Sequence, residues 1–222
     1  MKGFNPVLFF ELTALCVAIF RCYTTGDRSL LPFIFFLIVT NFVEWGNYFG
    51  IFTIRNPETG RGTNTWIFNV YNPLGFGFFA FFFRSILTSA AYRKRIPWLY
   101  IALLISVLIN ILFVQGIRDF DSYTYLLGCM LMLYCVYLYL SQLIKNPENT
   151  NIFYDRLFWI SIGCLFFYLG EFPLMSFFAY FQKIRDFSSF VPIYRFFSPL
   201  LNIVLYTCLS ISFLCRPKRP NI

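Results

Sequence analysis

Seven long apolar runs follow one another along the chain, and short polar segments separate them. The runs lie at about 6–22, 30–52, 66–87, 96–114, 123–143, 157–180 and 191–214. Because the hydrocarbon core of a bilayer is about 30 Å thick, a helix needs about 20 mostly apolar residues to cross it, and each run is near that length. The pattern therefore predicts an all-α polytopic membrane protein, a single domain (1–222) folded as a bundle of seven transmembrane helices.

The polar segments between the runs are short. The connectors 55–64 and 145–151 carry Asn-Pro and Gly turn signals, and neither is long enough for a catalytic domain. Glu11 interrupts the first run, and no small-residue cleavage site precedes a soluble domain, so we expect this run to be a retained helix and not a cleaved signal peptide. We find no internal repeat that indicates a duplicated transporter half.

The composition supports a membrane protein. Hydrophobic residues make up 59% of the chain and charged residues 13%, whereas an average soluble domain has about 25% charged residues. A net charge of +8 could indicate nucleic-acid binding in a soluble protein, but here the bases lie at the ends of apolar runs. We interpret them as topology signals and contacts to lipid headgroups, so the predicted partner is the bilayer and not a nucleic acid.

The distribution of Lys and Arg predicts the orientation, because cytoplasmic loops carry an excess of these residues. With the N-terminus outside, eleven bases face the cytoplasm: Arg21, Arg28, Arg84, Arg93, Lys94, Arg95, Lys145, Arg156, Arg216, Lys218 and Arg219. Seven face outward: Lys2, Arg55, Arg61, Arg118, Lys183, Arg185 and Arg195. The asymmetry favours an outside N-terminus and a cytoplasmic C-terminus.

Two features of the composition limit the chemistry. The chain has no histidine, which removes the usual zinc ligand and the base of a Ser-His nucleophile pair. The last run has no lysine to anchor a retinal, so we expect no metal, haem or retinal cofactor. The seven cysteines lie within apolar runs or at their ends, where buried reduced thiols are the default.

Three carboxylates lie within the apolar runs, at Glu11, Glu44 and Glu171. Ionisable residues inside a membrane are costly, and each is a functional-site hypothesis. Glu11 is about five residues after the start of the first run. The second and sixth runs cross the membrane in the opposite direction, and Glu44 and Glu171 lie about 8 or 9 residues before their ends. All three therefore belong to one leaflet, and the other half of the bundle is almost entirely apolar.

Neutral polar residues fall at similar depth, and several lie three or four positions from a carboxylate or from one another, on one helix face. The predicted ligand-binding site consists of Glu11, Asn41, Glu44, Tyr48, Asn69, Asn72, Asn110, Glu171, Ser198 and Asn202. Prolines 73, 173 and 199 are predicted to interrupt their runs and free backbone carbonyls. A structural role stays open, because asparagine contacts and proline kinks also occur in purely structural bundles.

The protonation of this site also follows from the sequence. Burial favours the neutral form of a carboxyl group unless a cation or several donors compensate. Arg195 is the one base near that depth, and its side chain could instead extend to the headgroups. We therefore predict that at least one of the three glutamates is neutral at pH 7 in the empty protein.

The segment 69–83 (NVYNPLGFGFFAFFF) is similar to small uncharacterised bacterial seven-helix membrane proteins associated with two-component sensor kinases. The resemblance implies a location in a bacterial inner (plasma) membrane and a signalling partner, and it assigns no functional residue. The predicted seven-helix topology, with the N-terminus outside, resembles that of receptor-type membrane proteins. The motifs of microbial rhodopsins and of G-protein-coupled receptors are absent from the sequence.

Three functions fit these features. The leading hypothesis is a sensory or signalling subunit whose outward polar pocket takes up a small polar or cationic ligand, with a partner protein for its output. The second is a carrier of a small solute or a cation, coupled to protons through the carboxylates. The third is a lipid hydrolase with two carboxylates as acid and base, as in lysoplasmalogenase-like membrane proteins of similar size. We favour a role without catalysis.

Overall fold

The computed structural model describes residues 5–55, 62–117, 119–145, 152–184 and 186–215. Within them lie seven helices that are long and apolar enough to cross a membrane. They are α1 Pro6–Thr25, α2 Leu31–Phe49, α3 Thr65–Ile86, α4 Ala90–Ile109, α5 Ser122–Lys145, α6 Arg156–Ile184 and α7 Val191–Leu214. The predicted helix bundle is confirmed, and its seven apolar helices are those of an integral membrane protein.

Most predicted boundaries are close to the observed ones, and the differences have local causes. α4 begins at Ala90, before the apolar run, because the basic residues 93–95 form its first turns. α2 ends at Phe49, earlier than predicted, since Gly50 adopts a left-handed conformation with φ 78° and ends the helix. α4 continues into a π-helical segment, Asn110–Val114. Pro73, Pro173 and Pro199 lie inside continuous helices rather than interrupting them.

Short elements connect the helices. The turn between α1 and α2 contains the 3-10 helix η1 Arg28–Leu30, and a second 3-10 helix, Ile152–Tyr154, precedes α6. Between α2 and α3, β1 Ile54–Arg55 pairs antiparallel with β2 Gly62–Thr63, which the sequence did not predict. Much of the two predicted turn-rich connectors, residues 56–61 and 146–151, lies outside the described residues.

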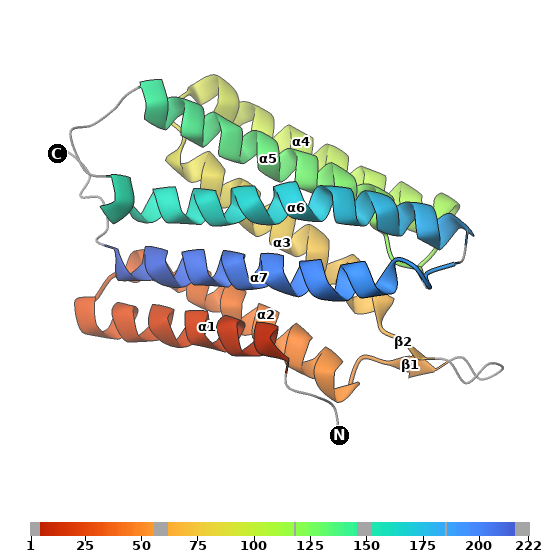
Figure 1. Ribbon diagram of the computed structural model, residues 1–222. Coiled ribbons are helices and arrows are strands. Elements are labelled where there is room, and N and C mark those ends of the chain that lie inside the picture. Colours follow the sequence, from red (N-terminus) through yellow and green to blue (C-terminus); the bar gives the residue numbers. More distant parts are fainter. Residues whose placement is uncertain (1–4, 56–61, 118, 146–151, 185, 216–222) are drawn as a thin grey trace.

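The helices run side by side along one axis, so the bundle has two ends (Figure 1). We call the end with the N-terminus, the β-hairpin and the α6–α7 connection the N-terminal end, and the opposite end the C-terminal end. α7 packs between α1 and α6, and α5 packs against α3, α4 and α6. α2 packs mainly against α1 and has few contacts with α3, and α4 lies outside against α3 and α5.

The half of the bundle toward the C-terminal end is closed by large apolar side chains. Phe79, Phe83 and Phe213 are fully buried there, together with Leu209. The ring of Phe33 contacts the ring of Phe213 edge-on, which joins α2 to α7. This half therefore has the apolar filling that the sequence predicted.

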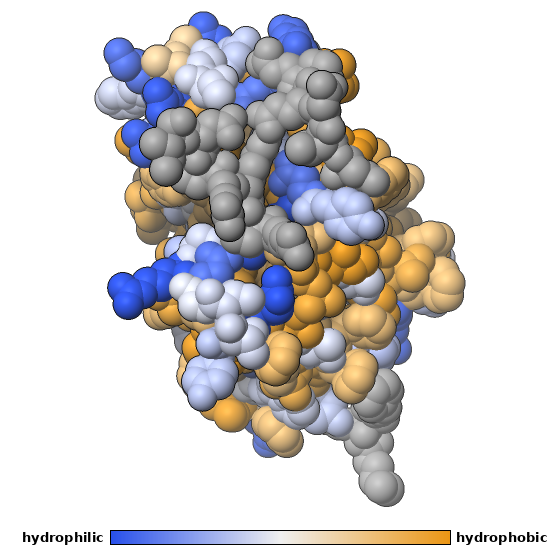
Figure 2. Space-filling view, turned by 90° about the vertical axis from the view of Figure 1, so that its left-hand side faces the viewer, coloured by the Kyte–Doolittle hydropathy of each residue, from blue (hydrophilic) through white to orange (hydrophobic). Residues whose placement is uncertain are grey.

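The C-terminal end is polar and basic. In Figure 2, which faces this end, hydrophilic residues gather toward the top, at the height of α4 and α5 in Figure 1. Of the bases that the structure describes, eight lie toward this end: Arg21, Arg28, Arg84, Arg93, Lys94, Arg95, Lys145 and Arg156. Three lie toward the N-terminal end: Arg55, Lys183 and Arg195.

Candidate functional site

A cavity of about 540 Å³ occupies the half of the bundle toward the N-terminal end. Its walls come from α2, α3, α5, α6 and α7, and residues at the start of α1 close one side. It reaches the N-terminal end between Asn5, Asn47, Asn64 and Thr65. Its polar lining is Asn5, Glu44, Asn47, Asn64, Thr65, Tyr71, Asn72, Tyr125, Tyr168, Glu171, Tyr194, Arg195, Ser198, Asn202 and Tyr206. The remaining lining is largely phenylalanine and aliphatic residues.

Glu171 occupies the α6 wall of this cavity and is only 1% exposed. Ser198 Oγ, on the neighbouring α7, donates a hydrogen bond to Glu171 Oε1 at 2.9 Å. Glu171 Oε2 is buried and has no hydrogen-bond partner among the described residues. Asn202, one turn beyond Ser198, directs its amide nitrogen to the Ser198 carbonyl oxygen at 2.9 Å. One oxygen of Glu171 is thus a buried acceptor with capacity for a further hydrogen bond.

Glu44 and Glu11 are the other two carboxylates of this region. Glu44 is half-buried and lines the cavity from α2. Glu11, on α1, is 1% exposed and lies behind the lining, close enough to Glu44 for the two charges to interact. Tyr206, whose side chain lines the cavity, hydrogen-bonds to Glu11, and Glu11 Oε2 has no partner among the described residues.

None of these three carboxylates has a basic partner in the part of the chain that the structure describes. The ion pair found there joins Arg156 to Asp27, at the C-terminal end. Arg195 lines the cavity from the first turn of α7, but its side chain is exposed. The cavity therefore brings together acidic groups that form no ion pair among the described residues, and two carboxylates face one exposed base in its lining.

The structure brings five of the ten predicted site residues to the cavity wall: Glu44, Asn72, Glu171, Ser198 and Asn202. Glu11 lies one layer behind them. Asn41 is buried outside the lining, where its Nδ2 donates to the Leu37 carbonyl oxygen at 2.9 Å. Tyr48 is half-buried near the end of α2, with its ring edge-on to Trp45. Ligand binding by any of them stays a prediction.

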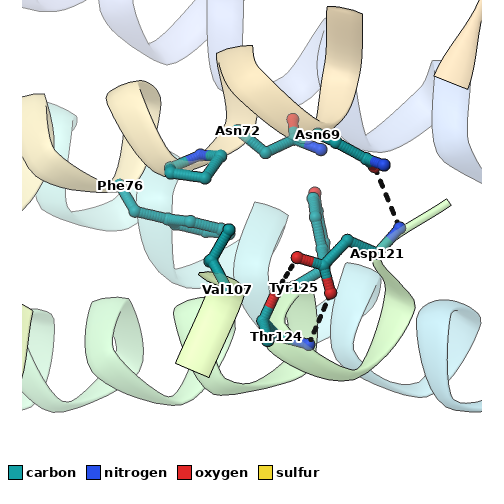
Figure 3. A pocket seen from close by; sticks show the side chains of 8 residues that line it. Asn69, Asn72, Phe76, Val107, Asp121, Thr124 and Tyr125 are labelled. Carbon is teal, nitrogen blue, oxygen red and sulfur yellow. Dashed lines mark hydrogen bonds between the residues drawn. The ribbon is translucent and has the colours of Figure 1, made fainter. Parts of the chain in front are cut away.

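Asn69 and Asn110 belong to a polar network around Asp121. Figure 3 shows Asn69, Asp121 and Thr124 of this network. Asn69 Oδ1 accepts a hydrogen bond from the Asp121 backbone nitrogen at 2.9 Å, and Asn69 Nδ2 donates to the Asp119 carbonyl oxygen at 2.8 Å. The Asp121 carboxylate accepts hydrogen bonds from Thr124 and from Asn110. These bonds fix the α4–α5 connection to α3, which is a structural role.

A small pocket lies between Asn69, Asn72, Phe76 and Tyr125 in this region (Figure 3). Its volume of about 10 Å³ leaves room for about one water molecule, so it is too small for an organic ligand. The large cavity is the candidate site.

The predicted site includes none of the five tyrosines that line the large cavity, which are Tyr71, Tyr125, Tyr168, Tyr194 and Tyr206. A signal for Tyr194 was present, because it lies four positions before Ser198 on the same helix face. Tyr71 lies on the cavity face of α3 beside Asn72, with Phe68 and Gly75 three and four positions away. Asp121 gave no signal, since a short connection between helices carries no periodic pattern.

Comparison of the chain with family models, curated proteins and solved structures finds no match. The chemistry of the cavity must therefore indicate the function. No group of three His, Cys, Asp or Glu side chains that could hold a metal ion occurs among the described residues. Carboxylates, tyrosine hydroxyls and aromatic rings are instead the groups that bind organic cations, through charge, hydrogen bonds and cation–π contacts.

Proposed function

We propose that this protein is a seven-helix membrane sensor that binds a small polar or cationic ligand in the cavity at its N-terminal end. The observation that supports the proposal is the lining of this cavity. Glu44 and Glu171 lie in its wall without basic partners among the described residues, next to many aromatic side chains. A volume of about 540 Å³ is within the range of about 300–1,000 Å³ that is typical of small-molecule sites.

An organic ammonium ion fits this lining best. Its charge pairs with Glu171, whose Oε2 lacks a hydrogen-bond partner among the described residues. Aromatic rings such as those of Phe76, Tyr125 and Tyr168 supply cation–π contacts from the same side of the cavity. Asn72 and Asn202 add polar contacts for a hydroxyl or carbonyl group.

Two features favour a sensor over a carrier. The path from the cavity to the C-terminal end is filled by buried apolar side chains, among them Phe79, Phe83 and Phe213. α6 and α7 both line the cavity and both extend to the C-terminal end, where Arg156 Nε of α6 donates to the Ser212 carbonyl oxygen of α7 at 3.3 Å. A ligand that shifts α7 against α6 would change the arrangement of the two helices at the C-terminal end. A partner protein bound at that end would respond to this change.

The proposal includes an orientation with the cavity outside and the C-terminus in the cytoplasm of a bacterium. The described bases support it, with eight toward the C-terminal end and three toward the N-terminal end. Cytoplasmic ends of membrane proteins are the ones enriched in Lys and Arg.

The test is titration calorimetry of the protein in lipid nanodiscs with tetramethylammonium, choline and a series of primary amines. We expect saturable binding of at least one of these cations, and loss of that binding in E171Q, because Gln keeps the shape of Glu but not its charge. The control is D186N, which removes a carboxylate from the exposed α6–α7 connection. Absence of binding by the wild type, or equal loss in D186N, would contradict the proposal.

Two further assays test the sensor against the other functions. Flux of a bound cation across proteoliposomes would show a carrier, and turnover of a labelled lysolipid by the purified protein would show a hydrolase. Co-purification of a histidine kinase without flux or turnover is the result that a sensor predicts.

A further inference from the structure

We propose that Glu11 and Glu44 form a proton-binding site at the side of the cavity, in which the two carboxylates together bind one proton and release it when a cation binds in the cavity. The release step rests on the proposed function. The proton site itself does not, because it depends only on the arrangement of α1, α2, α3 and α7.

Four helices contribute to this site. Glu11 comes from α1, Glu44 from α2, Tyr71 from α3 and Tyr206 from α7, and the two tyrosines interact electrostatically with both carboxylates. Tyr194, also of α7, lies within electrostatic range of Glu44. No basic side chain of the described residues forms an ion pair with either glutamate. The base nearest to them in the cavity lining is Arg195, whose side chain is exposed, so the groups around the pair are hydroxyls and not a paired cation.

If both carboxylates were ionised in these surroundings, their repulsion would raise the free energy of the protein. The charge of Glu44 acts on Glu11, and like charges repel more strongly in the low effective dielectric of a protein interior than in water. One proton removes this repulsion and also supplies a hydrogen-bond donor. Glu11 Oε2, which is buried without a partner among the described residues, is an acceptor that lacks such a donor.

The proton has a route to water. Glu44 and Tyr206 both line the cavity, and Tyr206 hydrogen-bonds to Glu11, so the buried carboxylate is connected to the cavity surface. When a cation binds in the cavity, its charge favours the ionised form of Glu44, and the proton passes to water in the cavity. The net charge of the site is unchanged by this exchange.

Glu171 is a separate anchor. Its hydrogen bond comes from Ser198, and it interacts with Tyr125, Tyr168 and Tyr194 rather than with Glu11. In this proposal Glu171 and the Glu11–Glu44 pair therefore have different roles. Glu171 holds the ligand in both protonation states of the pair, and the pair makes binding depend on pH.

The first experiment needs no ligand. Infrared spectra of the protein in nanodiscs at pH 7, in potassium buffer, report the carbonyl band of protonated carboxyl groups. We expect the E11Q/E44Q variant to lose the intensity of one carboxyl relative to the wild type, and E171Q to retain that intensity. Equal intensity in the wild type and E11Q/E44Q would overturn the proton site. So would disappearance of the band when sodium replaces potassium, because that result shows a metal-ion site.

Two single variants test the same proton site if the double variant does not fold. E11Q and E44Q each change one of the two groups that share the proton, so each is expected to shift or remove the band. An unchanged band in both single variants would overturn the proposal.

The release step is tested with the probe tetramethylammonium in weakly buffered solution with a pH-indicator dye. We expect up to one proton released per cation bound by the wild type and none by E11Q/E44Q. Binding without proton release overturns the release step. Failure of the wild type to bind this or any other cation overturns the proposed function, while the infrared result still decides the proton site.

Discussion

Arg156 Nη2 lies 2.7 Å from Asp27 Oδ2, and this ion pair joins the first residue of α6 to the turn between α1 and α2. Arg156 Nη1 also donates to Ser29 Oγ at 2.9 Å, and its Nε donates to the Ser212 carbonyl oxygen near the end of α7. One side chain therefore connects three parts of the C-terminal end. The side chains of Arg156 and Asp27 are 8% and 12% exposed, so water screens the pair only weakly.

Breaking this ion pair should destabilise the bundle. Removal of one partner from a buried pair leaves an uncompensated charge and costs about 3 kcal/mol, so we expect R156M and D27N each to lower the melting temperature in detergent by several degrees. D186N is the matched control, since Asp186 Oδ1 accepts from Ser188 N and Oγ as Asp27 Oδ1 accepts from Ser29, but in an exposed turn. Equal effects of D27N and D186N would show that the arginine contributes nothing.

The same ion pair predicts how stability depends on pH. Burial alone would raise the pKa of Asp27, but hydrogen bonds from Ser29 and the charge and hydrogen bond of Arg156 outweigh it, so the pKa is lowered. A group with a lowered pKa in the folded state stabilises it above the unfolded-state pKa of about 3.9, and this stabilisation is lost as the pH falls through the folded-state pKa. Melting temperatures between pH 6 and pH 3 should fall less steeply for D27N than for the wild type. Parallel curves would contradict the assignment.

Asn69 and Asn72 of α3 should separate a structural role from a binding role. In N69A the Asp121 backbone nitrogen loses its acceptor and the Asp119 carbonyl oxygen a donor, so we expect a loss of about 1–3 kcal/mol in stability. Cation affinity should change little. N72A should do the reverse, because Asn72 lines the cavity. Calorimetric affinity and melting temperature of both variants check this pair, and weaker binding with unchanged stability in N69A would refute it.

The periodic part of the fold was predictable from sequence, and the connections were not. α7 begins and ends where its apolar run does, because Pro192 and the polar tail mark its ends. The start of α4 was missed because residues 93–95 are charged and apolar counting excludes them. Asn69 was grouped with Asn72 by spacing, yet its contacts come from residues about 50 positions later in the chain, which no local pattern reveals.

The orientation of the bundle is testable apart from the cavity. A reporter fused after Ile222 should be active only when that reporter works in the cytoplasm, because the C-terminal end carries most of the described bases. A paired fusion within the α6–α7 connection should give the opposite result. Activity of the C-terminal fusion only outside the membrane would reverse the orientation, and the grouping of the carboxylates at one depth would be unaffected.

Ser198 offers the sharpest test of how Glu171 binds a cation. Its hydroxyl is the hydrogen-bond donor to Glu171 Oε1, and a hydrogen bond to a charged group contributes about 1.5 kcal/mol or more. In S198A the carboxylate loses this donor, which stabilises its charged form and holds its orientation. We therefore expect affinity for the probe cation to fall about tenfold with little change in melting temperature.

Ser210 supplies the matched control for that substitution. It lies about three turns farther along α7, toward the C-terminal end, and its Oγ donates to the Tyr206 carbonyl oxygen at 2.8 Å and not to a carboxylate. S210A removes the same hydroxyl group from the same helix and should leave affinity unchanged. If S198A and S210A weaken binding equally, the effect comes from the backbone of α7 and not from Glu171. If neither weakens it, Glu171 does not bind the cation through the geometry described.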